Sequence, residues 1–261
     1  MSGDGLPEDR LTEAGAALPL GIAPSSAAYA LSEAEMASAP PSRRRFWWIH
    51  RKLREEIVLH KYPPGTRLNV DNLAAEFDVS RTPIRSVLQR LEQEGLVVTR
   101  HGVGTLVTEI DFERLREASL LRMELAELIG HLDPLPPTPA AIEAMEDLVA
   151  QCAGLFEARD NAAFGRIDMQ VHEIICGLIG NSLLRQYYDE LYHRTARMWF
   201  YFMPQLDWES EIAIFQADIA ARVRAMRRSD TRAVGYLIRN EISAVVIRLA
   251  DLFTVAEKQS K

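Results

Sequence analysis

A helix-forming stretch with a proline in its first turn and a glycine at its end constrains this chain more than any other feature. It reads DVSRTPIRSVLQRLEQEGLV and covers residues 78–97. Ser80 is placed to cap the helix by accepting a hydrogen bond from a first-turn N–H. Pro83 costs little there, because a first-turn N–H has no partner within the helix. The stretch therefore predicts a short helix that starts after Ser80 and stops at Gly95.

Charge is distributed unevenly along the chain. The formal net charge is −7 over 261 residues. Residues 1–42 carry six acidic residues against Arg10 alone, and residues 111–261 are also net acidic. Residues 43–110 instead carry 12 Lys and Arg against 8 Asp and Glu. Only this middle segment has the sign that favours a polyanionic partner such as nucleic acid.

The residues around the opening stretch predict the rest of one small domain. FWWIHRKLREEIVLHK (46–61) places Trp48 or Ile49 on one stripe with Leu53, Ile57 and Val58, as in an amphipathic helix. YPPGTRL breaks that helix, and VDNLAAEFD follows as a short helix capped by Asp71. After Gly95, LVVTRHGVGTLVTEI reads as strand, tight turn and strand. Three helices and a β-hairpin describe a winged helix-turn-helix.

The remaining sequence is mainly helical. We expect a mainly α fold in which the winged helix-turn-helix (43–110) is followed by a helical domain (111–258), with a disordered tail at 1–42. The helical domain should be an antiparallel bundle of about six helices. They are expected near 111–131, 139–158, 160–180, 182–203, 208–229 and 230–256. Two cysteines and no long apolar run favour a cytoplasmic protein without a disulfide framework or a membrane span.

The helix of the opening stretch carries the chemistry of DNA recognition at its leading end. Arg81 and Thr82 lie in its first turn, and Arg85 follows one turn later on the same face. A guanidinium there can pair with guanine O6 and N7 in the major groove, and a hydroxyl can reach phosphate. Arginines at this spacing alone also fit a solvated surface. The flanking helix and hairpin favour DNA binding.

These motifs resemble the DNA-binding domain of GntR-type bacterial transcription regulators. SRTPIRSVLQRLEQEGLV follows their SRTPVREAL..LE.EGLV pattern, and the resemblance covers about residues 46–110. It implies contacts to double-stranded DNA from two groups of residues. They are Ser80, Arg81, Thr82 and Arg85 in the recognition helix, and His101 and Gly102 at the wing tip.

Three positions in this domain depart from the family pattern or extend it. Asp78 stands where the turn usually has glycine, and aspartate tolerates the left-handed backbone conformation. Asp71 stands where some members have a basic residue, which argues against a DNA contact from the second helix. Arg43 to Arg45 precede the first helix, as either a flexible backbone-tracking arm or a solubilising run.

The helical half resembles the effector domain of the FadR-like branch, known as the FCD type. IDMQVHEIICGLIGNSLL places Asp168 and His172 four apart on one helix, the spacing of the branch's metal-binding pair. Ile219 and Glu241 stand where two further histidines are expected. We therefore expect no metal, and Asp168 and His172 would take part only in a reduced site, with Glu241 and Cys176 as further donors. Otherwise His172 is expected to hydrogen-bond Asp168 or an effector.

The resemblance also implies a small-molecule effector, often an organic acid. The expected pocket comprises Arg122, Asp168, His172 and Glu241. Arg194 or Arg197 is a further candidate for pairing with an acidic ligand, although each arginine also fits an ordinary surface position. Trp199 and Phe202 are expected in the core, with an apolar pocket wall or a dimer contact as the alternative.

Three hypotheses follow for the function. The first is a homodimeric repressor that binds a palindromic operator under control of a metabolite. The second is a DNA-binding protein whose helical half serves only dimerisation. The third is a helical metalloprotein using Asp168 and His172. We favour the first, and we do not expect an enzyme, because the sequence contains neither a nucleophile elbow nor a phosphate loop.

Overall fold

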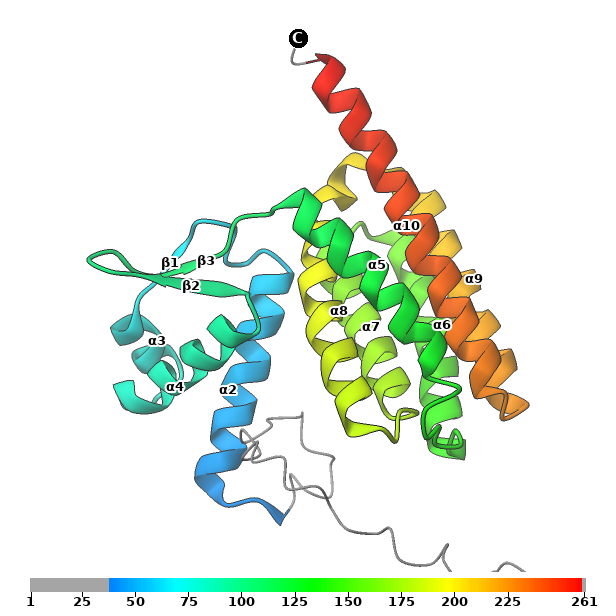
Figure 1. Cartoon of the computed structure of the whole chain (residues 1–261), viewed down its shortest axis with the longest axis horizontal. Coiled ribbons are helices and arrows are strands. Elements are labelled where there is room, and N and C mark those ends of the chain that lie inside the picture. The colour runs from blue at the N-terminus through cyan, green and yellow to red at the C-terminus, as the bar shows by residue number, and fades with distance from the viewer. Residues whose placement is uncertain (1–37, 260–261) are drawn as a thin grey trace, which may run out of the picture. The chain divides into compact units, whose positions relative to one another are not determined.

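Three helices around one apolar cluster form the N-terminal part of the computed structural model, which describes residues 38–259. They are α2 (Pro41–Val58), α3 (Val70–Glu76) and α4 (Arg81–Gln93) (Figure 1). Ile49, Leu53 and Ile57 of α2 are completely buried, whereas Trp48 is 52% exposed. The sequence allowed either Trp48 or Ile49 on the apolar stripe of this helix. The structure places Ile49 there.

The wing is a three-stranded antiparallel sheet in the order β1-β3-β2. Strands β2 (Val97–Arg100) and β3 (Gly104–Val107) form the expected hairpin, with Thr99 opposite Thr105. Strand β1 (Arg67–Leu68) adds to β3 and was not predicted, because two residues are too short to show an alternating pattern.

Two helix starts and one capping bond differ from expectation. α2 begins at Pro41, so Arg43 to Arg45 lie in its first turns and are not an extended arm. Asn69, not Asp71, caps α3, because its side chain accepts hydrogen bonds from the N–H groups of residues 71 and 72. Ser80 occupies the N-cap position of α4, but its hydroxyl makes no capping hydrogen bond. The expected position is correct there, and the expected bond is wrong.

The turns before and after α4 behave as predicted. Asp78 has φ 49° and adopts the left-handed conformation that the family's glycine would supply. Gly95, with φ 75°, follows the last turn and ends the helix. The first lies between α3 and α4, and the second leads directly into β2.

The C-terminal part is a helical bundle with its own core. The helices are α5 (Phe112–Leu128), α6 (Pro139–Glu157), α7 (Asn161–Cys176), α8 (Ser182–Phe202), α9 (Trp208–Arg227) and α10 (Thr231–Gln259), and they match the predicted ranges closely. α5 packs along α10 and α8, and α6 along α7 and α9 (Figure 1). Side chains such as Phe164, Tyr188 and Ile219 fill the interior. Phe202 is buried as expected, and Trp199 packs against the same core.

Asp and Asn side chains set several starts of the bundle helices. Asp111, Asp160, Asn181 and Asp207 each accept hydrogen bonds from first-turn N–H groups. Within the described residues, no helix is both long enough and apolar enough to traverse a bilayer. The predicted tail at 1–42 lies largely outside the described residues.

Candidate DNA-binding surface and ligand pocket

The exposed side of α4 presents the residues expected to contact DNA. Ile84, Val87 and Leu91 are completely buried and fix the opposite side of the helix in the core. Arg85 is exposed and forms no ion pair within residues 38–259. Thr82 is also exposed. The helix is therefore anchored on one side and offers a free guanidinium on the other.

Arg81 and Arg90 do not share this freedom. Arg81 Nε pairs with Asp71 on α3, and both side chains are largely exposed. Arg90 turns away from the recognition side. Its Nε donates to Glu94 at 2.8 Å and its Nη2 donates to Glu190 of α8 at 3.0 Å. The arginines of α4 thus have two roles. Arg81 and Arg85 face solvent, whereas Arg90 forms ion pairs with Glu94 and Glu190.

The wing tip is the second part of the candidate surface. His101 and Gly102 are exposed in the turn between β2 and β3. Gly102 has φ 75°, and a Cβ at this position would meet nothing within 4 Å. The turn therefore needs glycine for its backbone conformation and leaves the tip open to a partner.

A cavity of about 70 Å³ lies inside the bundle between α5, α7, α8, α9 and α10. Three of the four predicted pocket residues line it, namely Arg122, Asp168 and Glu241. His172 does not line this cavity. Its Nε2 donates to Asp189 of α8 at 3.0 Å, so the expected partner Asp168 was wrong. Aromatic and carboxylate side chains complete the lining, including Tyr192, Trp199, Glu211 and Asp218.

The residues at the family's metal position do not fit a metal. Asp168 Oδ2 accepts a hydrogen bond from the Tyr192 hydroxyl at 2.6 Å. Ile219 is completely buried and offers no donor atom. Glu241 pairs with Arg222, whose guanidinium is buried one turn beyond Ile219. The guanidinium of Arg222 thus already neutralises Glu241, one of the carboxylates that a metal ion would need there.

Arg122 lies at the cavity wall without an acidic partner. Its Nη1 donates to Thr195 Oγ1 at 3.2 Å, and its guanidinium lies 4.9 Å from the Tyr192 ring centroid. Its Nε has no hydrogen-bond partner, and no carboxylate within the described residues pairs with it. The arrangement leaves donor capacity at the wall for an anionic ligand.

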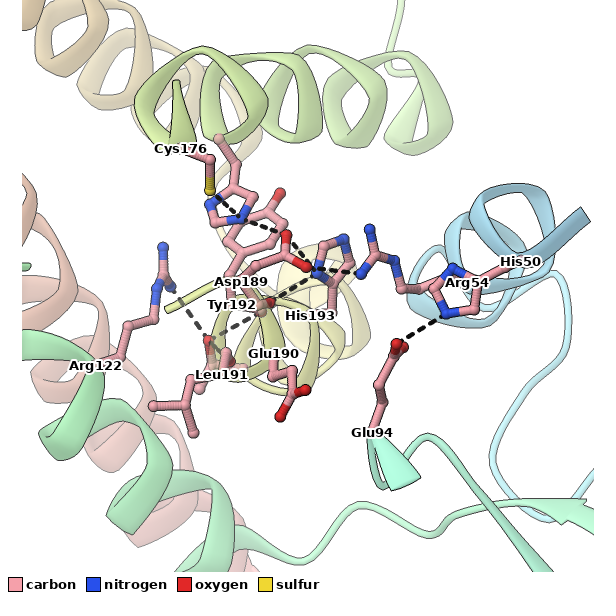
Figure 2. Close-up of polar contacts among 12 residues, drawn as sticks. His50, Arg54, Glu94, Arg122, Cys176, Asp189, Glu190, Leu191, Tyr192 and His193 are labelled. Atoms are coloured by element: carbon pink, nitrogen blue, oxygen red, sulfur yellow. Dashed lines mark hydrogen bonds and ion pairs between the residues drawn. The ribbon is translucent and has the colours of Figure 1, made fainter. Parts of the chain in front are cut away.

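Helix α8 has a second face, which contacts the DNA-binding part (Figure 2). Asp189 Oδ2 accepts from Arg54 Nη1 of α2 at 2.8 Å. Arg194 Nε donates to the backbone carbonyl of Glu94, at the C-terminal end of α4, at 2.6 Å. Arg197 donates to the side chain and carbonyl of Thr108, both at 2.7 Å. Arg194 and Arg197 were candidates for the ligand cavity. Both instead contact the DNA-binding part.

A buried His–Glu pair continues this contact into the DNA-binding part. His50 Nε2 donates to Glu94 Oε1 at 2.9 Å, and the two side chains are 2% and 3% exposed. Burial alone would raise the pKa of Glu94, but the hydrogen bond from His50 and the charges of Arg54 and Arg90 lower that pKa to about 2. Burial lowers the pKa of His50, so its imidazole is neutral near neutral pH.

Asp189 is the centre of a second buried group. Burial would raise the pKa of Asp189, but Arg54, His193 and His172 together hold it well below its usual range. Burial, followed by the charge of Arg54, lowers the pKa of His193 to about 3. His172 stacks on the Tyr192 ring with centroids 3.6 Å apart. One carboxylate thus faces both the bundle interior and the DNA-binding part.

Sequence reasoning missed these contact residues for a specific reason. Arg54 and Asp189 are separated by 135 positions, and Arg90 and Glu190 by 100. No periodicity connects positions that far apart. The signal that could have found them is Arg54, which follows Leu53 on the buried side of α2. A buried charged side chain requires a partner of opposite charge.

Comparisons with known proteins agree with this architecture. Residues 48–107 match the family model described as bacterial regulatory proteins, gntR family, and residues 117–244 match the FCD domain. An uncharacterised HTH-type regulator of Streptomyces ambofaciens is 42% identical over 40% of this chain. The matched region spans 44% of that relative's length.

Two longer matches cover both halves of the chain. The Uxu operon transcriptional regulator of Escherichia coli K12 is 27% identical over 84% of this chain and 92% of its own. The solved structure of E. coli McbR/YncC superposes with a TM-score of 0.69 over 80% of this chain and 98% of its own, at 18% identity. At this identity, the likeness shows a shared fold and says nothing about function. These names describe regulators and not enzymes, and together with the two family models they show that the chain belongs to the GntR family of bacterial regulatory proteins and carries an FCD domain.

Proposed function

We propose that this protein is a homodimeric, cytoplasmic transcriptional repressor that binds a palindromic operator under control of a small organic acid. Arg85, free on the exposed side of a helix whose opposite side is buried in the core, is the observation that carries the DNA-binding role. The N-terminus of α4 adds the positive end of the helix dipole beside it. Ser80, Arg81, Thr82, His101 and Gly102 are proposed as the further contacts.

Replacing Arg85 by Ala is expected to weaken binding to the specific site by about 1–3 kcal/mol, because a bidentate base contact is lost. The site would first be recovered by selection from randomised duplexes. Affinity would then be measured at fixed salt, with Arg228→Ala as a control that removes one exposed positive charge from the end of α9. Equal affinities for the two variants would contradict the role of Arg85.

The dimer is proposed from the symmetry of palindromic recognition. Two recognition helices related by a two-fold axis read two equivalent half-sites. Large apolar side chains of the kind that subunit interfaces cover are exposed on α5 and α10. They are Leu120, Leu121, Tyr236 and Ile247, each at least 42% exposed.

The proposed effector binds at Arg122 in the bundle cavity. A guanidinium without a carboxylate partner favours an anionic ligand, and the nearby aromatic rings favour a planar or apolar body. A cavity of about 70 Å³ admits a ligand of only a few heavy atoms, since a single water needs roughly 10–15 Å³ by the same measure. A short-chain organic acid meets both conditions.

Helix α8 provides the physical connection between ligand and DNA. Tyr192 and Thr195 touch the cavity, while Asp189, Arg194 and Arg197 hold the DNA-binding part. A ligand that shifts or rotates α8 changes both sets of contacts together. Control of operator affinity requires such a differential interaction with two conformations.

Replacing Arg122 by Met is expected to weaken binding of the acid by roughly 10- to 150-fold, corresponding to about 1.5–3 kcal/mol for a charged hydrogen bond. A panel of short organic acids would be screened by thermal shift, and affinities would be measured by calorimetry. Arg116→Met, an exposed arginine on the same helix, is the matched control. If no acid binds the unaltered protein, the bundle serves assembly and not sensing.

A further inference from the structure

One group of three potential metal ligands lies outside the ligand cavity and shares only His172 with the family's metal position. His172 and Cys176 are one turn apart on α7, and Asp189 faces them from α8. Their donor atoms all lie within 4.8 Å of one another. His172 Nε2 is 3.3 Å from Cys176 Sγ and 3.0 Å from Asp189 Oδ1. Figure 2 labels Cys176 and Asp189 of this group.

We propose that His172, Cys176 and Asp189 form a binding site for a thiophilic divalent cation of the Zn²⁺ type, with water as the fourth ligand. Tetrahedral bonds of about 2.0–2.3 Å place neighbouring donor atoms roughly 3.3–3.8 Å apart. The two separations from His172 Nε2 need to change by only a few tenths of an ångström, and the donor atoms of Cys176 and Asp189, which lie within 4.8 Å, would approach by up to about 1 Å. Binding releases the thiol proton to solvent and shifts the imidazole proton of His172 from Nε2 to Nδ1, so that the thiolate and the bare Nε2 bond the cation.

The donor set selects the class of cation. One imidazole nitrogen, one sulfur and one carboxylate oxygen are typical of zinc sites, whereas calcium and magnesium require oxygen ligands. The side chain of Asp189 is 23% exposed, which gives a cation a route from solvent. Tyr192 stacks on the His172 ring at 3.6 Å and holds its orientation.

The site differs from the family's metal position in all but one ligand. Asp168 is engaged by Tyr192, and Glu241 is engaged by Arg222, so neither belongs to the group. The site is displaced toward the face of α8 that contacts the DNA-binding part. Its carboxylate is the same one that receives Arg54 at 2.8 Å, so the cation and Arg54 share one negative charge.

The test is a cobalt and zinc titration of the chelator-stripped full-length protein. We expect one Co²⁺ per chain, with a thiolate-to-metal charge-transfer band in the near ultraviolet. Zn²⁺ should displace Co²⁺, and its affinity would be measured by competition with a chromophoric chelator. Absence of the band, or of saturable binding, overturns the proposal.

Variants separate this site from the alternatives. Cys176→Ser should abolish the charge-transfer band and weaken Zn²⁺ binding by roughly 10- to 100-fold or more. Cys152→Ser, which alters the chain's other cysteine on α6, should retain both, and it also assigns the band to Cys176 if Cys176→Ser fails to fold. Asp168→Asn should leave binding intact. If Asp168→Asn loses the metal and Cys176→Ser keeps it, the cation occupies the family's position and the proposal is wrong.

Discussion

Replacing Glu94 by Gln is expected to destabilise the protein by about 2–4 kcal/mol at pH 7, because buried charges lose their partner. Glu94 is 3% exposed and accepts from His50 at 2.9 Å and from Arg90 at 2.8 Å. The amide keeps the shape of the carboxylate but carries no charge. Chemical denaturation followed by circular dichroism would measure the change.

The pH dependence of the free energy of unfolding tests the role of Glu94 independently. The pKa of Glu94 is lowered from 4.5 to about 2 on folding. The carboxylate therefore contributes stability fully above about pH 4.5, and this contribution is lost as the pH falls from 4.5 toward 2, about 3 kcal/mol in total. Burial lowers the pKa of His50, so acid also destabilises the pair from pH 6.5 downward.

The Gln variant should therefore lose stability less steeply than the unaltered protein below pH 4.5. Glu117→Gln is a suitable control, because Glu117 is an exposed carboxylate on α5. It should leave both the stability at pH 7 and the acid slope nearly unchanged. A Glu94 variant indistinguishable from this control would show that the buried pair is not a source of stability.

Local chemistry explains why the recognition helix and the bundle could be predicted from the sequence. Pro83 and Gly95 mark the two ends of α4 within a few residues, and apolar residues every three or four positions mark its buried side. The breaks between bundle helices are marked in the same local way, by DPLPPTP and by capping Asp and Asn side chains. Each signal depends only on neighbouring residues.

Capping bonds were predicted less well than helix positions. Asn69 and Asp71 both carry side chains suited to capping, and they lie two residues apart. Which one caps depends on where the chain leaves β1, and β1 itself shows no sequence pattern. At Ser80 the backbone takes the predicted position without the predicted bond, because the position is fixed by the turn and not by the hydroxyl.

The candidate pocket was predicted in part, since Arg122, Asp168 and Glu241 line it. What the sequence could not supply was the direction of α8's polar residues. Arg194 or Arg197 was a candidate partner for an acidic ligand, but both point to the DNA-binding part. The exposed large side chains of α8, Leu183, Tyr187 and Tyr201, are apolar or aromatic, so no polar stripe marks its solvent side. Periodicity alone therefore does not assign its polar residues to one side.

Breaking the ion pair between Arg54 and Asp189 is the second change with a large expected effect. Removing one partner of a buried pair costs about 3–5 kcal/mol, and the 23% exposure of Asp189 reduces this to about 2–4 kcal/mol for Arg54→Met. Asp189→Asn should cost a similar amount. Both unfolding free energies would be measured in chelator, so that no metal competes for the carboxylate.

A double-mutant cycle isolates the pair itself. If the pair links α2 to α8, the double variant should be more stable than the sum of the single changes predicts, by about 1.5–3 kcal/mol. Arg116 and Glu113, 60% and 83% exposed and 3.8 Å apart on α5, form the control pair, for which less than about 1 kcal/mol is expected. A coupling energy for Arg54 and Asp189 as small as that of the control would mean that solvent already screens the pair. Helix α8 would then hold the DNA-binding part through Glu190, Arg194 and Arg197, and any signal from the cavity would have to pass through those contacts.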